Sequence, residues 1–190
     1  MLAFVMAVSA SRSGRQADTA EHCITQIARR ERRALAQLYE QTHAAVYGFA
    51  LSILKNRQDA EDVLQDTYVQ IWNAAGSYAA AGKPMAWIFT ITRNLALMRL
   101  REGSRTVPVA PEDWQALFSD EPAVDPADGL MLKLLMETLS DGERQVVMLH
   151  VMTGLKHREI ADLLGLRLST VLSRYSRALK KLDQAWKEAD

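Results

Sequence analysis

Short hydroxyl side chains are interspersed with Arg and Lys near the C-terminal end of the chain. Between Thr153 and Leu182 seven Lys and Arg residues stand against two acidic ones, although the whole chain has 23 Lys and Arg and 23 Asp and Glu. Arg can donate two hydrogen bonds to one guanine, Ser, Thr and Lys can hold phosphates, and an apolar side chain can touch a thymine methyl. The candidate DNA-binding residues are Arg158, Ser169, Thr170, Leu172, Ser173, Arg174, Ser176, Arg177 and Lys181. A solvated basic helix in an ordinary bundle is the alternative interpretation.

A second basic segment contains no acidic residue at all. From Lys83 to Arg101 there are four cations and no Asp or Glu, a pattern typical of a nucleic-acid surface. The tyrosine just upstream, Tyr78, is able to stack on a base. The candidate residues of this second surface are Tyr78, Lys83, Thr90, Arg93, Asn94 and Arg101.

Polar residues of a different kind are spaced at helical intervals upstream of both basic segments. Asp62, Gln65 and Asp66 stand at i, i+3 and i+4, so they share one face of a helix. Two carboxylates on one face suit a basic partner. Acids also collect at helix N-termini because the helix dipole favours them there, which explains Glu61 and Asp62 better than Asp66.

Residue patterns for catalysis, metal binding or cofactor binding are not found in the sequence. It has no Gly-rich phosphate loop, paired-carboxylate site or Ser–His–Asp order. His22, Cys23 and His43 do not have the spacing of usual zinc ligands. His150 and His157 flank a predicted turn and are assigned packing or solvent roles. We therefore expect no catalytic residue, metal or cofactor, and an enzyme or metal-dependent sensor is kept as an alternative.

The elements that position these residues are predicted to be helices. Ala, Leu, Arg, Gln and Glu, all good helix formers, dominate the sequence, and runs typical of strands are scarce. The fold class is therefore all-α. The last helix is predicted to run from Thr170 to about Trp186, with Ser169 as its N-cap. It follows a short helix that ends at Gly165, so the pair forms a helix-turn-helix.

Apolar spacing predicts which side of each helix is buried. The last helix has one stripe, and the helix before it supplies the opposing face. Two helices of the N-terminal half have stripes of their own. The predicted stripes are Val171, Tyr175, Ala178 and Leu182; Ile160, Leu163 and Leu164; Ala60, Leu64, Tyr68 and Ile71; and Ile88, Ile91, Leu95 and Met98.

Composition divides the chain into two small helical domains. We expect a flexible tail over residues 1–20, a bundle of three or four helices over 21–102, a linker over 103–128 and the helix-turn-helix domain over 129–190. The linker is acidic and holds four of the five prolines, which block helix continuation. In the last domain Ser140 and Glu143 form a predicted capping box, and Gly154 is a predicted helix stop.

Features of the chain as a whole favour a cytoplasmic protein. Cys23 is the only cysteine, so an intrachain disulfide is impossible. No apolar run approaches the ~20 residues that cross a membrane. The opening MLAFVMAVSA resembles a signal peptide but lacks a basic start, so a disordered leader or a true start at Met6 is favoured.

Three stretches follow one another along the chain: DAEDVLQDTYVQIW, then AWIFTITRNLALMRLRE and, after the linker, LSDGERQVVMLHVMTGLKHREIADLLGLRLSTVLSRYSRALKKL. In this order and spacing they resemble bacterial sigma factors of the extracytoplasmic-function type, from about Ala34 to Leu182. The C-terminal pattern alone is not specific, because helix-turn-helix response regulators share it. The resemblance therefore rests on both halves of the chain together.

The resemblance implies a role for each surface. The first domain would bind the β′ clamp helices of core RNA polymerase through Asp62, Gln65 and Asp66. The loop from Ser77 to Pro84 and the helix after it would recognise and melt the minus-ten element. The second domain would read the minus-thirty-five element, and the linker would thread the polymerase cleft. Expected partners are core polymerase with its β subunit, promoter DNA and an anti-sigma factor. The free chain would be a monomer without membrane insertion.

This sequence departs from the family's pattern at three positions. Met98 stands where an acid is common, three residues before Arg101. Leu172 and Leu179 stand where basic residues are common, and with Leu168 they form an apolar strip that either touches DNA or is covered by an inhibitory partner. An autonomous helix-turn-helix regulator that binds operators as a dimer is the other functional alternative.

Overall fold

A computed structural model describes residues 18–79, 82–103 and 138–189. Apart from Gly103, the linker expected over 103–128 lies outside the described residues, as does the tail up to residue 17. All regular structure within the described ranges is helical, which confirms the all-α prediction. Residues 18–20, which were predicted to belong to the tail, are helical, and Ala20 is fully buried.

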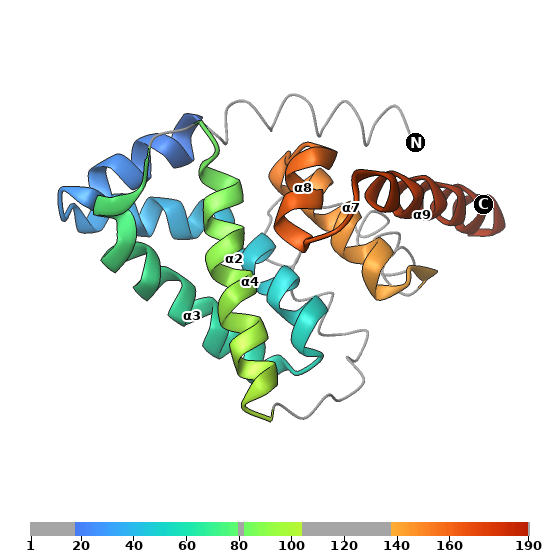
Figure 1. Ribbon diagram of the computed structural model, residues 1–190, viewed down its shortest axis with the longest axis horizontal. Helices are drawn as coiled ribbons and strands as arrows, with labels where there is room; N and C mark the ends of the chain where they lie inside the picture. The colour runs from blue at the N-terminus through green and yellow to red at the C-terminus, as the bar shows by residue number, and fades with distance from the viewer. Residues whose placement is uncertain (1–17, 80–81, 104–137, 190) are drawn as a thin grey trace.

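The N-terminal half is a bundle of four α-helical segments and one short 3-10 helix (Figure 1). Helical residues 18–28 are followed by α2 (Arg32–Leu54), α3 (Arg57–Ala74), the short 3-10 helix η1 (Ala75–Ser77) and α4 (Pro84–Arg101). Phe49 of α2 and Phe89 of α4 meet edge to face in its core, with ring centroids 5.4 Å apart. Asn56 caps α3 by accepting a hydrogen bond of 3.1 Å from the Asp59 amide.

The C-terminal half consists of three helices whose ends largely follow their local sequence signals. Helix α7 (Asp141–Thr153) begins with the predicted capping box of Ser140 and Glu143 and ends at Gly154. Helix α8 (His157–Leu164) ends at Gly165. Both glycines have φ near +70°, a conformation that costs other residues strain, so these two predicted stops are confirmed.

The predicted start of the last helix is wrong by two residues. Helix α9 runs over Leu168–Ala189. The carbonyl of Arg167 accepts hydrogen bonds from the amides of Thr170 and Val171, so the first turn of the helix already includes Ser169. Ser169 therefore lies in that first turn, exposed to solvent, and is not the N-cap.

The predicted buried stripe of α9 is confirmed without change, and the stripes of α8 and α3 are each confirmed except for one half-buried Leu. All four stripe residues of α9 are buried, and so are Ile160 and Leu163 of α8, with Leu164 half-buried beside them. On α3 the predicted stripe is buried except for Leu64, which is half-buried.

The predicted stripe of α4 is wrong near the C-terminal end of the helix. Met98 is 50% exposed, and the buried line instead passes through Ile88, Thr92 and Ala96. The cause is Arg99, which donates a hydrogen bond of 3.0 Å to Asp59 of α3 and pairs with Asp62. Because Arg99 faces α3, its neighbour Met98 is turned towards solvent.

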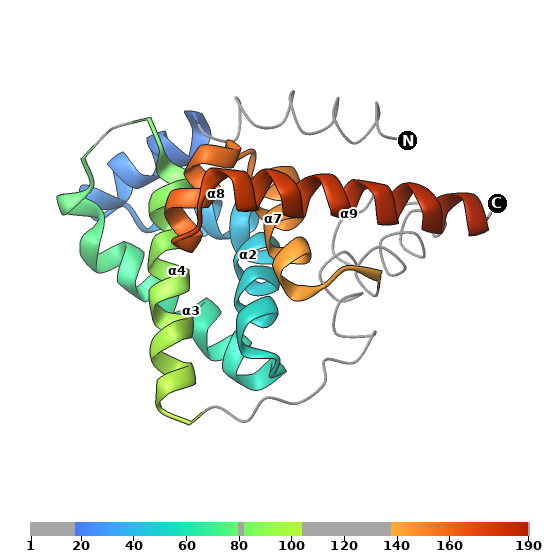
Figure 2. The same cartoon turned by 45° about the vertical axis from the view of Figure 1, so that its right-hand side comes forward.

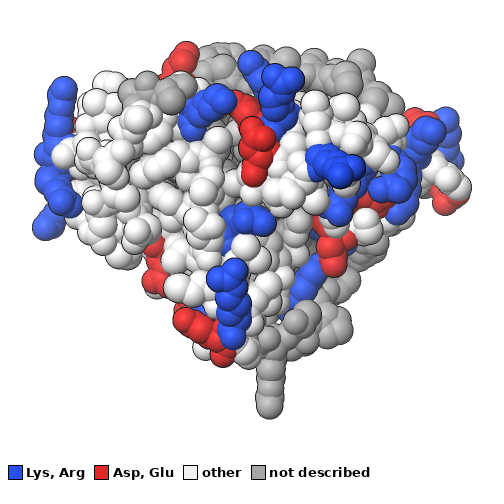
Figure 3. Space-filling model, in the orientation of Figure 1, with Lys and Arg blue, Asp and Glu red and all other residues white. Residues whose placement is uncertain are grey.

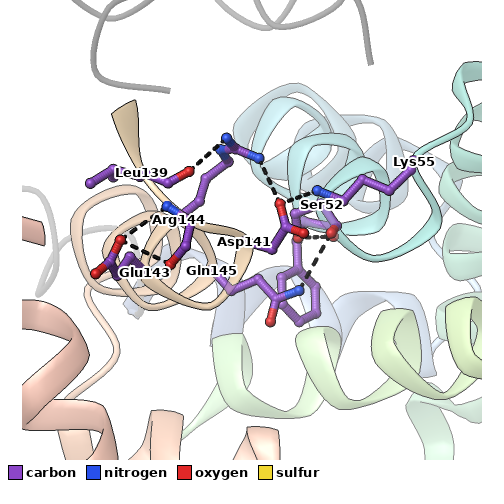
Figure 4. Close-up of polar contacts among 9 residues, drawn as sticks. Ser52, Lys55, Leu139, Asp141, Glu143, Arg144 and Gln145 are labelled. Carbon is purple, nitrogen blue, oxygen red and sulfur yellow. Dashed lines mark hydrogen bonds and ion pairs between the residues drawn. The ribbon is translucent and has the colours of Figure 1, made fainter. Parts of the chain in front are cut away.

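The two halves pack against each other through α2 with α7 and through α4 with α8 (Figures 1 and 2). Met148 of α7 is buried among residues of α2, α3 and α4. Lys55 pairs with Asp141, and the side-chain amide of Gln145 donates to the Ser52 carbonyl at 3.5 Å (Figure 4). One continuous core therefore joins residues of both halves.

Across the described ranges, no helix is both long enough and apolar enough to span a membrane. Within the same ranges no group of three or more His, Cys, Asp or Glu residues is gathered as a metal site would require.

Candidate nucleic-acid and polymerase interfaces

Helix α9 presents three different surfaces besides its buried stripe. At 100° per residue, Ser169, Ser173 and Ser176 lie on the outward side, opposite the stripe, and all three are exposed. One flank, hereafter the cation flank, carries Thr170, Arg174, Arg177 and Lys181. The other flank, hereafter the leucine flank, carries Leu168, Leu172 and Leu179.

The cation flank and the serine side have the donors that a DNA groove needs. Arg177 and Lys181 are exposed, whereas Thr170 and Arg174 are half-buried. Arg158 is exposed on α8, so it adds a cation from the first helix of the pair. In the space-filling view, Lys and Arg side chains gather over the side of the molecule formed by α7, α8 and α9 (Figure 3). Apart from Leu172, which lies on the leucine flank, the sequence-predicted residues of this surface therefore lie on the serine side and the cation flank of α9 and on α8, which packs against α9.

A buried carboxylate lies under the cation flank. Glu143 of α7 is 5% exposed, and its two oxygens lie 2.7 Å from Lys181 Nζ and 3.7 Å from Arg177 Nε. Ser140 donates to Glu143 Oε2 from its amide at 3.0 Å and from its hydroxyl at 2.9 Å. Burial on its own would raise the pKa of Glu143, but the bond from Lys181 and the two from Ser140 outweigh it and lower the pKa to about 2.

On α4 the predicted polar residues divide into an exposed face and two engaged side chains. Thr90, Asn94 and Arg101 are exposed, and their spacing of four and seven residues puts them on one side of the helix. Arg93 is half-buried and donates to the backbone carbonyl of Leu164 at 3.3 Å. Lys83 is exposed and lies 3.8 Å from a carboxylate oxygen of Glu159.

Tyr78 is held within the protein. Its hydroxyl donates to Glu21 at 2.6 Å, and its ring packs on Trp87 with centroids 5.0 Å apart. Burial, followed by the hydrogen bond and the negative charge of Glu21, raises the pKa of Tyr78. In this arrangement the ring is half-buried, so stacking on a base requires it to leave Trp87 or to offer its remaining face.

The acidic face of α3 is divided in the same way. Gln65 and Asp66 are exposed, whereas Asp62 is half-buried and paired with Arg99. Asp62 therefore already has a cationic partner inside the chain. Any basic partner meets Gln65 and Asp66 first.

Sequence reasoning missed an apolar hollow beside Asp66. It is lined by Arg32, Leu35, Tyr68, Val69 and Trp72 of α2 and α3. Val69 is 59% exposed, and an exposed apolar side chain that lines a hollow is an informative feature of a surface. The available signal was the pair Val69 and Trp72, which are apolar and lie outside the predicted stripe of α3.

Comparison with known proteins gives matches in both halves of the chain. Residues 38–106 match the family model for Sigma-70 region 2, and residues 129–182 match the model for Sigma-70, region 4. The ECF RNA polymerase sigma factor SigK of Mycobacterium sp. (strain KMS) is 32% identical over 168 residues, which are 84% of this chain and 86% of that protein.

Two solved structures are also similar. CnrH in complex with the cytosolic domain of CnrY aligns with a TM-score of 0.57 and 27% identity, covering 90% of this chain and 99% of CnrH. RpoE of Bartonella quintana, in complex with the anti-sigma factor NepR, aligns with a TM-score of 0.55 and 28% identity, covering 80% and 96%. An autonomous helix-turn-helix regulator would not need the region 2 half. The chain belongs to the extracytoplasmic-function sigma factors of RNA polymerase.

Proposed function

We propose that this sigma factor binds core RNA polymerase and directs it to promoters by contacting two DNA elements, while the polymerase performs the chemistry. The observation that carries the proposal is the presence, in one chain that matches both sigma regions, of two separate surfaces suited to DNA and one suited to a basic protein. The protein acts in the cytoplasm, where the polymerase is, and is a monomer when free.

Helix α9 reads the minus-thirty-five element in this proposal. Its buried stripe anchors it on α7 and α8, so the serine side and the cation flank are free to enter a major groove. Arg177 grips a base edge, and the hydroxyls and the remaining cations hold phosphates. The residues assigned are Arg158, Ser169, Thr170, Leu172, Ser173, Arg174, Ser176, Arg177 and Lys181.

Helix α4 and the loop before it contact the minus-ten element. Thr90, Asn94 and Arg101 are assigned to the DNA because they form an exposed face free of acids. Lys83 and Arg93 join them once their contacts with α8 are released. Tyr78 is assigned to base stacking, which helps offset the few kcal/mol that unstacking a base costs.

The polymerase clamp contacts α3. Gln65 and Asp66 supply the polar part of this surface, and the hollow beside Val69 supplies an apolar part that can bury a partner's side chain. Asp62 contributes to the negative potential of the face, although its direct partner is Arg99.

An anti-sigma factor is a further proposed partner, supported by the similarity to RpoE, whose structure contains one. The leucine flank of α9 has two candidate roles. Leu168 and Leu172 are exposed and can be covered by an inhibitory protein, or Leu172 can contact a thymine methyl in the groove. Co-purification with core polymerase tests the proposal as a whole, since a sigma factor must associate with it and start transcription.

A further inference from the structure

The first turn of α7 touches three cations of α9 that lie on one flank. Glu143 contacts Arg177 and Lys181, as described above. At the residue before it, a Cβ added to Gly142 would come within 2.8 Å of the Arg174 guanidinium carbon. The bare backbone of Gly142 therefore leaves the room that Arg174 occupies.

The negative charge of Glu143 is not needed for its role in the capping box. A capping box requires an acceptor for the N-cap amide, and Gln fulfils this as well as Glu. The carboxylate does more than this, because Oε2 accepts from Ser140 twice and from Lys181, while Oε1 faces Arg177. Placing an ionised carboxylate at 5% exposure carries a desolvation cost, which the two facing cations offset.

The contact reaches Arg177 from one side only. Glu143 faces the Nε of Arg177, and the Arg177 side chain is still 62% exposed. The Nη groups, which carry four of the five guanidinium N–H donors, remain for another acceptor. An Arg whose orientation is already restricted loses less conformational entropy when it grips a base edge.

We propose that Glu143 is a positioning residue for DNA recognition, which orients Arg177 on α9 for a base contact and Lys181 for a phosphate contact without touching the DNA itself. The inference rests on the proposed placement of α9 in the groove. Gly142 serves the same arrangement by accommodating Arg174.

A positioning role and a purely structural role of Glu143 predict different effects of Glu143→Gln on the affinity for random-sequence DNA. Removing a negative charge next to phosphate-binding cations raises sequence-independent affinity, since that affinity is electrostatic. Losing the orientation of Arg177 lowers sequence-specific affinity. A purely structural role would instead lower both affinities together, because a loosened α7 would misplace the whole of α9.

The experiment uses the full-length chain assembled with its cognate core RNA polymerase. Wild-type holoenzyme first selects a preferred duplex from a library randomised over the upstream element. Affinities for that duplex and for random-sequence DNA are then measured at one fixed salt concentration for wild type and Glu143→Gln. We expect the ratio of specific to random affinity to fall by about tenfold, which corresponds to one well-made base contact, with random-sequence affinity unchanged or higher.

The same substitution in an Arg177→Ala, Lys181→Ala background is the matched control. There Glu143→Gln should not lower the ratio further, because the side chains that it positions are gone. Circular dichroism and co-purification with the polymerase verify the fold of each variant. Gly142→Ala is a second variant, whose added Cβ displaces Arg174 while favouring the helix, so specific affinity should fall severalfold with the fold retained.

An equal fall of both affinities, or an undiminished effect in the background without Arg177 and Lys181, would overturn the positioning role. Failure of wild-type holoenzyme to select any duplex is a different result. It would overturn the placement of α9 on DNA, and the inference with it.

Discussion

The guanidinium of Arg93 on α4 donates a hydrogen bond of 3.3 Å to the backbone carbonyl of Leu164, the last residue of α8. The helix proposed for the minus-ten element thus touches the helix-turn-helix proposed for the minus-thirty-five element. By their names these elements are separated by about 25 base pairs, or roughly 85 Å of duplex at about 3.4 Å per base pair. The two halves must therefore separate on a promoter.

This separation is open to direct measurement by distance-sensitive spin labels. Labels at Gly76→Cys in η1 and Lys187→Cys in α9 attach to exposed positions, one in each half of the chain, and the native Cys23 is fully buried. We predict that the distance between the labels rises by several nanometres when the free chain enters a holoenzyme–promoter complex. An unchanged distance would contradict the proposal that one chain contacts both promoter elements at the same time.

Asp66 and Asp62 should respond differently to substitution. Asp66→Arg places a cation on the exposed acidic face, so we expect affinity for core polymerase to fall about tenfold or more, with the thermal midpoint unchanged. Asp62→Ala removes one of the two acidic partners of Arg99 and should lower the thermal midpoint only slightly, because Asp59 remains and the pair is partly exposed. Titration with core polymerase and thermal melting separate the two effects.

If Asp66→Arg bound core polymerase as tightly as wild type, the acidic face of α3 would be removed from the mechanism. The hollow provides an independent check. Val69→Asp should weaken the same association without unfolding the chain, since Val69 is largely exposed.

Arg177→Ala should weaken binding to the selected upstream duplex by about 1–3 kcal/mol if the guanidinium grips a base edge. Binding to random-sequence DNA should change much less. Gln184→Ala, an exposed substitution on the same helix that lies outside the residues assigned to DNA, is the control for general disturbance of α9. Equal losses on both kinds of DNA would reduce Arg177 to a phosphate contact.

Stability should depend on pH through Glu143. Its pKa is lowered to about 2 in the folded chain from an ordinary value of 4.5. Above about pH 5 the carboxylate is ionised in both states and its full contribution is present. As pH falls from there towards 2, the unfolded chain binds the proton first, so the free energy of unfolding decreases.

Urea denaturation across that range, for wild type and Glu143→Gln, measures this contribution. We predict a shallower loss of stability on acidification in the variant, because Gln has no proton to bind. Identical slopes would show that Glu143 titrates alike in the folded and unfolded chains.

Local signals in the sequence predicted the helix ends and the helix-turn-helix well. The capping box of Ser140 and Glu143 and the stops at Gly154 and Gly165 depend only on residues within a few positions of each other. The apolar stripe of α9 repeats over three turns, so its burial could be read from the sequence alone.

The features that the sequence did not reveal depend on contacts between distant segments. Arg99 faces α3 because it pairs with Asp59 and Asp62, two carboxylates that come some forty residues earlier in the chain. As a result Met98 faces solvent. Met148 fits a core formed by the other half of the chain. Periodicity shows that a residue is buried, but not against which partner it packs.

Glu143 illustrates the same limit at the candidate site. Its place in the capping box was predicted, whereas its contacts with Arg177 and Lys181 were not, because they join α7 to α9 across more than thirty residues. The site residues on α9 could be predicted by type and face. The carboxylate beneath them could be recognised only once the two helices were packed.

In vitro transcription with cognate core polymerase and a genomic library of templates tests the central claim most directly. The account predicts that the purified chain co-purifies with core polymerase and that RNA starts at defined sites only when the chain is added. These sites should share two upstream sequence elements. A chain that neither associates with core polymerase nor starts RNA at any site on any template would contradict the account.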